Sequence, residues 1–147
     1  MAQEPYRFLA EVEPLDRPDR RLNVDAGAGQ LNAALARAIV RIHRNVVGRG
    51  PTKAQAFFRH NVVVIVMREV LTPLERTLAA NHDVDLVRAI RRTAKRAMLP
   101  DLQETVERLT GCGVEVSLGD TDVEADTAVL IFTLDRPVGL EVLRESD

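Results

Sequence analysis

Apolar residues recur at helical spacing in the stretch that begins at Gly29. Its five large aliphatic residues follow one another at intervals of four, four, three and four: Leu31, Leu35, Ile39, Ile42 and Val46. This spacing places them on one face of a helix. Gly48 ends the pattern, because glycine is the usual residue just after a helix C-terminus. The pattern predicts an amphipathic helix over residues 29–47.

Two pairs of apolar segments indicate β-hairpins. Val62–Met67 is apolar at every position, which is typical of a central strand covered on both faces. Ala54–Arg59 precedes it across His60-Asn61, and Asn tolerates the backbone of a tight turn. Residues 114–118 alternate as in an edge strand, and Thr127–Leu134 is again nearly all apolar. Each pair therefore predicts an edge strand beside a central one.

Two helices are expected between the hairpins. Thr72 is followed by Pro73 and, three residues after the threonine, by Glu75, which is the pattern of a capping box at a helix start. Asn81-His82-Asp83 breaks that helix. A second apolar stripe then runs to Gly111, straight through Pro100. No capping residue stands immediately before Pro100, so a kinked continuous helix is favoured over two abutting helices.

The predicted element order is α-β-β-α-α-β-β, which indicates an α+β fold. The two hairpins would pair through their central strands into one four-stranded antiparallel sheet with helices packed on it. Residues 26–135 form the expected single domain. Residues 1–25, with three prolines among alternating charges, are expected to be a flexible arm, and residues 136–147 a tail.

Composition limits the cellular location of the protein and the kinds of site that it can contain. The chain has 147 residues and one cysteine, Cys112, which excludes an internal disulfide and any paired-cysteine metal motif. The first 21 residues contain acids and prolines where an export signal needs an apolar core. The longest uncharged stretches are far shorter than the ~20 apolar residues of a membrane span. We expect a cytoplasmic protein without membrane insertion.

Charge is distributed unevenly along the chain. Residues 26–100 carry 13 basic and four acidic groups, and residues 101–147 carry three and 12, so these two segments have charges of +9 and −9. The two parts could attract each other within the fold, or the basic part could bind an external anionic partner. The residues that would form such an anion-binding or partner-binding face are Arg37, Arg41, Arg44, Arg49 and Lys53.

No motif predicts catalysis, a metal or a cofactor. Residues 120–126 alternate carboxylates as an EF-hand loop does, but Ala125 and Ile131 replace the required Gly and Glu, so a solvated turn is favoured. Residues 48–53 lack the spacing and the strand-to-helix context of a phosphate loop. The three histidines lie in different elements, which gives no metal-ligand spacing. Cys112, between two glycines, could be an exposed thiol, but nothing around it indicates a nucleophile.

Several turns and caps resemble, in order, one bacterial family. They are the segment at residues 48–51, the segment at residues 71–78, the Leu109-Thr110-Gly111 turn, and the closing Phe132-Thr133-Leu134. Over residues 31–134 the chain is similar to the small domain of unknown function labelled "Na+-translocating membrane potential-generating system MpsC". The positions that match this pattern have structural roles as turns, caps or a kink: Gly48, Gly50, Pro51, Thr72, Glu75, Pro100 and Gly111.

The resemblance implies a role beside a membrane ion or bicarbonate transport system. A chain with no membrane span cannot itself move sodium, so we expect a non-enzymatic soluble accessory or regulatory protein with a membrane-transport protein as partner. A nucleic-acid-binding module that uses the basic helices is the alternative. It is disfavoured because aromatics are scarce and no nucleic-acid-binding motif is present. An enzyme with an unrecognised site is the third hypothesis.

Self-association is expected from the helix at residues 29–47. The two central strands are apolar at both alternations, so each face of the sheet needs a cover. The helix could cover the second face within the same chain, but its aliphatic stripe is regular enough to pack against a copy of itself or to lie across a partner's sheet. The sequence therefore predicts a homodimer with Leu35, Ile39 and Ile42 at or beside the interface.

Overall fold

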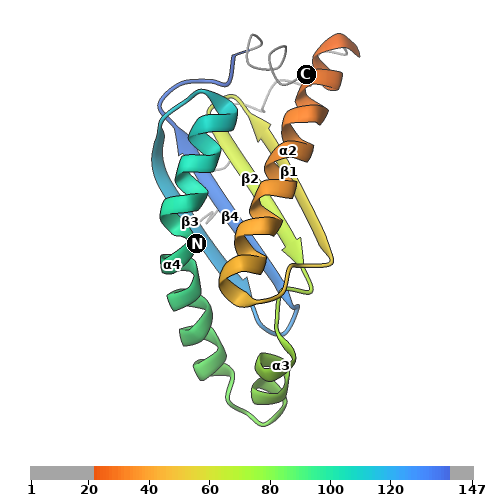
Figure 1. The fold of residues 1–147 in the computed structure, drawn as a ribbon, viewed down its shortest axis with the longest axis vertical. Coiled ribbons are helices and arrows are strands. Elements are labelled where there is room, and N and C mark those ends of the chain that lie inside the picture. The colour runs from red at the N-terminus through yellow and green to blue at the C-terminus, as the bar shows by residue number, and fades with distance from the viewer. Residues whose placement is uncertain (1–21, 140–147) are drawn as a thin grey trace, which may run out of the picture.

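A computed structural model describes residues 22–139 of the chain (Figure 1). The elements follow the expected order, and the fold is α+β. The helices are α2 (Leu22–Val47), α3 (Pro73–Ala80) and α4 (Val84–Thr110). The strands are β1 (Lys53–Arg59), β2 (Val62–Arg68), β3 (Val114–Asp122) and β4 (Thr127–Leu134).

The four strands form one antiparallel sheet in the order β1-β2-β4-β3. The two hairpins therefore pair through their apolar strands, β2 and β4, as the sequence predicted. The edges are β1 and β3, whose alternating patterns suit a strand with one neighbour. A register shift between Val114 and Val116 marks a bulge in the outer strand β3.

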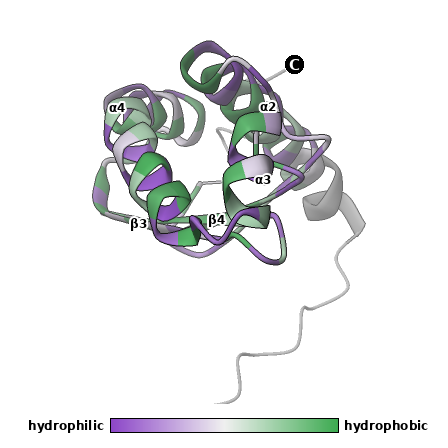
Figure 2. Ribbon diagram, turned by 90° about the horizontal axis from the view of Figure 1, so that it is seen from below, coloured by the Kyte–Doolittle hydropathy of each residue, from purple (hydrophilic) through white to green (hydrophobic). Residues whose placement is uncertain are grey.

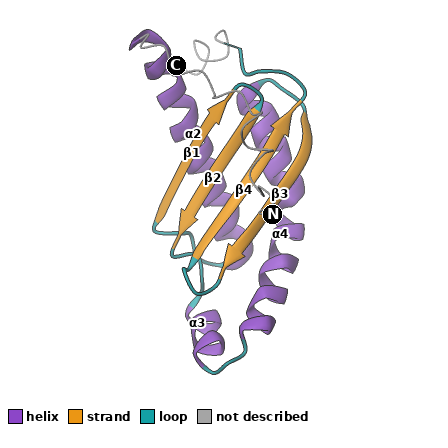
Figure 3. Ribbon diagram, turned by 180° about the vertical axis from the view of Figure 1, so that it is seen from behind, coloured by secondary structure: helices purple, strands orange, loops and turns teal. Residues whose placement is uncertain are grey.

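The two long helices lie on the same side of the sheet, as the views from the front and from below show (Figures 1 and 2). The core fills the space between them, and Leu31, Leu35, Val63 and Phe132 are fully buried there. The short helix α3 lies beyond one end of the sheet and contacts α4. The opposite side of the sheet carries no helix of the described residues (Figure 3).

Local signals set the helix boundaries. Both bonds of the capping box at the start of α3 are present: Thr72 Oγ1 accepts from the Glu75 N–H at 3.2 Å, and Glu75 Oε1 accepts from the Thr72 N–H at 3.1 Å. The longer helix α4 continues through Pro100 and ends at Gly111, whose φ of 70° favours glycine. The first helix begins at Leu22 instead of residue 29, so residues 22–25 belong to it and not to the predicted flexible arm. The rest of that arm lies outside the described residues.

Candidate functional site

The predicted basic residues do not form one patch. Arg37, Arg41 and Arg44 are exposed on α2, in the helical layer. Arg49 lies in the turn after that helix and is partly buried. Lys53 is exposed at the start of β1, where it pairs with Arg68 on the side of the sheet away from the helices. The fold therefore separates Lys53 from the other four residues.

The residues predicted for a dimer interface lie in the chain's own core instead. Leu35 and Ile39 are 0% and 1% exposed, because α2 packs across β1 and α4 within the same chain. Ile42 is partly buried against the same core. The helical stripe therefore closes the core, and Leu35 and Ile39 are not exposed to a second copy.

Three of the turn residues identified from the sequence lie at the end of α2. Gly48 has a φ of 83° and donates its N–H to the Arg44 carbonyl, which closes α2. Gly50 lies close to that helix, because an added Cβ would stand 3.2 Å from Val40 Cγ1. Pro51 is buried beside it. These residues turn the chain sharply from the end of α2 into the edge strand β1.

A buried polar cluster joins all three helices, and the sequence pattern missed it. Arg91 is 7% exposed although its neighbours on α4 place it on a polar face. Its guanidinium donates from Nε to Glu75 Oε2 at 2.7 Å and from Nη2 to Glu75 Oε1 at 2.9 Å. It also donates to the Val70 carbonyl. This geometry is a two-bond arginine–carboxylate pair, which is stronger than a single ion contact.

His43 completes this cluster from α2 and is 2% exposed. Its Nδ1 lies 2.7 Å from the Arg49 carbonyl, and its Nε2 lies 2.9 Å from Arg91 Nη1. Since arginine only donates, Nε2 accepts and Nδ1 carries the proton, so the ring is neutral. Burial lowers the pKa of His43 below its ordinary value of 6.5, and the charge of Arg91 lowers it further, against the opposing effect of the Arg49 carbonyl.

The cluster links the three helices, because each of its charged or polar side chains is bonded within it. Glu75 serves both Arg91 and the helix cap at Thr72, and His43 has both ring nitrogens occupied. The only local signal for this arrangement was the capping glutamate. The other two residues are distant in sequence. Arg91 lies 16 residues from Glu75, and His43 lies 48 residues from Arg91.

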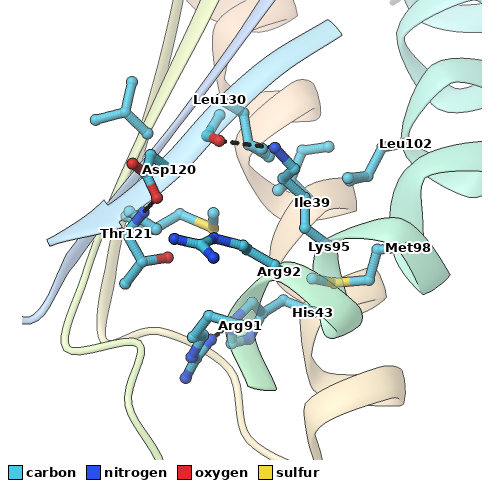
Figure 4. Close-up of a pocket in the computed structure, with 14 residues that line it drawn as sticks. Ile39, His43, Arg91, Arg92, Lys95, Met98, Leu102, Asp120, Thr121 and Leu130 are labelled. Atoms are coloured by element: carbon cyan, nitrogen blue, oxygen red, sulfur yellow. Dashed lines mark hydrogen bonds between the residues drawn. The ribbon is translucent and has the colours of Figure 1, made fainter. Parts of the chain in front are cut away.

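A cavity of about 40 Å³ lies beside the cluster, between α4 and the sheet (Figure 4). Its walls include Met98, Leu102 and Leu130, with Arg92 and Lys95 at its polar side. Lys95 Nζ donates to the Gly119 carbonyl at 2.7 Å, which ties α4 to the edge strand β3. The volume accommodates a few water molecules at most.

The acidic turn between β3 and β4 does not gather ligands for a metal. No group of three or more histidine, cysteine or acidic residues that could hold a metal ion occurs within residues 22–139. Asp126 instead accepts from the Leu71 N–H at 2.9 Å and pairs with Arg76 at 3.3 Å. The turn therefore connects the sheet to the start of α3. The thiol of Cys112, considered as an exposed group, is buried at 4% exposure.

The side of the sheet away from the helices is the most distinctive surface of the described chain. We call it the open sheet face (Figure 3). The strand register places four residues of each strand on it, in four rows from β1 to β3. The rows are Lys53-Arg68-Thr127-Asp122, Gln55-Val66-Val129-Asp120, Phe57-Val64-Ile131-Leu118 and Arg59-Val62-Thr133-Val116.

Half of these sixteen positions are apolar. The apolar residues on the edge strands β1 and β3 are the most exposed. Phe57, Val116 and Leu118 have 48%, 47% and 59% of their surfaces exposed. The valines and Ile131 between them are partly buried by their neighbours in the sheet. A contiguous apolar surface rimmed by charged residues is typical of a protein-binding face.

No helix within residues 22–139 is both long enough and apolar enough to cross a membrane. The model of one family, described as "Na+-translocating membrane potential-generating system (MpsC)", matches residues 27–136. The match covers the whole sheet and most of α2. No curated protein and no solved structure matches the chain.

Proposed function

Because the chain belongs to the MpsC family, described as a Na+-translocating membrane potential-generating system, we propose that it is a non-enzymatic accessory or regulatory protein of a membrane ion-transport system. In this proposal it is a soluble cytoplasmic homodimer that acts through protein–protein contacts. Translocation itself would be carried out by a membrane-embedded partner.

The open sheet face is the observation that carries this proposal. Its exposed Phe57, Val116 and Leu118 adjoin the partly buried valines of β2. Burying such a surface against another protein removes apolar area from water and is favourable. The polar cluster of the interior supports the same conclusion, since its groups bond to one another and stabilise the packing of the helices.

The exposed arginines of the helical layer favour a second candidate, a polyanion-binding protein. Arg37, Arg41 and Arg44 line α2, and Arg92 and Arg96 are exposed on α4. Nucleic acid bound by such a layer would dissociate steeply with added salt, because each neutralised phosphate releases counterions. We expect only weak, non-specific binding at physiological salt, and a tight, sequence-dependent complex would favour this candidate.

Removal and restoration of the protein in its own cells tests the transport role. We expect its loss to reduce the Na+-dependent part of the membrane potential, measured with a voltage-sensitive dye. Re-expression of the wild-type chain should restore the potential. Mild crosslinking should recover a membrane ion-transport protein with the tagged chain. An unchanged potential together with recovery of nucleic acid alone would contradict the proposal.

The variant Phe57→Glu provides the site-specific arm of this experiment. Its exposed position makes a folding defect small, while a buried charge at a contact surface is unfavourable. It should fail to restore the potential, whereas the control Arg41→Glu, on the exposed side of α2, should restore it. Equal restoration by both variants would remove the open sheet face from the function.

A further inference from the structure

The open sheet face has a basic edge and an acidic edge. Lys53 and Arg59 lie on β1, and Arg68 stands beside Lys53 at the same end of the face. Asp120 and Asp122 lie on β3, at the opposite edge. The apolar residues fill the two inner strands apart from Arg68 and two threonines, and they reach the edges at Phe57, Val116 and Leu118. The two edges of the face therefore carry opposite charges.

We propose that the open sheet face binds a second copy of the same chain around a two-fold axis that runs parallel to the strands. The two sheets would stack face to face, and the helical layers would point outward on both sides. The dimer rests on the proposed function, which assigns this face to a protein contact and the chain to a homodimer.

The choice of axis follows from the charges. Two stacked sheets prefer nearly aligned strands, which leaves an axis either along the strands or across them. With an axis along the strands, each row faces the same row of the second copy, and β1 of one copy lies over β3 of the other. Lys53 then faces Asp122 of the second copy, and Phe57 faces Leu118 of the second copy. The Lys53–Asp122 contact forms at both edges, the apolar row that contains Phe57 meets its own copy, and Arg59 faces Val116 of the second copy.

An axis across the strands gives the opposite result. The strand β1 would then lie over β1 of the second copy, and β3 over its β3. The order of the four rows would be reversed, so that the first row would face the fourth. Lys53 would lose its contact with Asp122, which would lie over Val116 of the second copy. No pair of opposite charges would meet at either edge, so the attraction between the copies would be lost. The charge distribution therefore favours the axis along the strands.

The size of the face indicates a reversible dimer. Four strands about 4.8 Å apart, each contributing seven residues at about 3.4 Å, cover roughly 450 Å² per copy. Stable complexes bury about 800 Å² per partner, so this contact lies below that range, among weak and transient complexes. We expect monomer and dimer to exchange, with a mass that rises from 16.3 kDa toward twice that value as concentration increases.

Charge reversal at the two edges tests the arrangement with the full-length chain. The dimer has two equivalent contacts, each between position 53 of one copy and position 122 of the other. In Lys53→Glu both contacts join a glutamate to Asp122. In Asp122→Lys both contacts join a lysine to Lys53. Since both contacts become repulsive, we expect each variant alone to dimerise roughly tenfold more weakly than wild type. Sedimentation equilibrium of the purified proteins measures these constants.

Mixing the two variants is the decisive step. In a heterodimer of Lys53→Glu with Asp122→Lys, one contact joins the two substituted side chains, a glutamate and a lysine. The other contact joins the native Lys53 to the native Asp122. Both contacts attract, so the equimolar mixture should regain near wild-type dimerisation. The two positions cannot pair within one chain, because β2 and β4 separate their strands by about 14 Å.

Two variants with matched charge changes serve as controls. Arg41→Glu and Glu107→Lys alter exposed residues of the helices, and neither they nor their mixture should change the dimerisation constant. A wild-type chain that stays monomeric at every concentration would overturn the proposal, as would a dimer indifferent to both edge variants. Single defects without recovery in the mixture would refute the axis along the strands. Because this assay uses the protein alone, its outcome is independent of any transport partner.

Discussion

Removal of the guanidinium of Arg91 should cost far more stability than removal of a neighbouring arginine. Arg91 pairs with Glu75, and the exposed fractions of the two side chains are 6% and 3%. Arg91→Met leaves the Glu75 carboxylate buried without its counter-charge, and such a loss typically costs about 3–5 kcal/mol. The Val70 carbonyl and His43 Nε2 lose a donor at the same time.

Arg88→Met is the matched control on the same helix. Arg88 also pairs with a carboxylate, Asp85 at 3.1 Å, but the two side chains are 47% and 98% exposed. Water screens such a pair, and its contribution is about 0–1 kcal/mol. The same substitution one helical turn away therefore differs mainly in the burial of the ion pair.

Urea unfolding measures both effects. With a slope near 2 kcal/mol per molar, a loss of about 4 kcal/mol lowers the midpoint by about 2 M, against less than about 0.5 M for Arg88→Met. Glu75→Gln should partly rescue Arg91→Met, because it removes the unpaired charge and retains the capping bond. Equal midpoints for the two arginine variants would refute the argument that the buried pair holds the three helices together.

Two further predictions concern the same region. Thr72→Ala should lower the free energy of unfolding by about 1 kcal/mol, because the side chain no longer accepts the Glu75 N–H, and an unchanged thermal midpoint would contradict this. His43 is neutral in the folded protein, with its pKa lowered mainly by burial. Unfolding exposes it to protonation, so its contribution to stability is complete above about pH 6.5 and is lost as the pH falls toward the lower folded pKa. In urea melts between about pH 5 and 7.5, His43→Gln should weaken this dependence; an identical pH profile in the variant would exclude His43 as its source.

Much of the fold followed from the sequence because its signals are local. The period of the aliphatic residues identified the first helix, and the Thr72–Glu75 pattern identified the start of α3. Two segments that are apolar at every or nearly every position identified the central strands, which pair as β2 and β4. The first seven residues of α2, 22–28, were missed, since the small residues at 26–28 interrupt the pattern of large aliphatic side chains.

The buried cluster could only be decided by the tertiary structure. Arg91 has basic neighbours at helical spacing, Arg88, Arg92 and Lys95, so its sequence context is that of a solvated face. Its burial depends on Glu75 and His43, which lie in two other helices. An arginine is buried where its charge and its donors are satisfied, and distant residues supply both here.

The side of the sheet that faces outward also depended on tertiary packing. Both alternations of β2 and β4 are apolar, so their sequences cannot distinguish the covered face from the open one. The short side chains Ala54 and Ala56 of β1 admit α2 on one side, while Phe57 lies on the other. The aliphatic stripe predicted to join two chains was thereby placed in the core of one. The sequence determined that a second apolar sheet face exists, and the packing of the helices determined which residues form it.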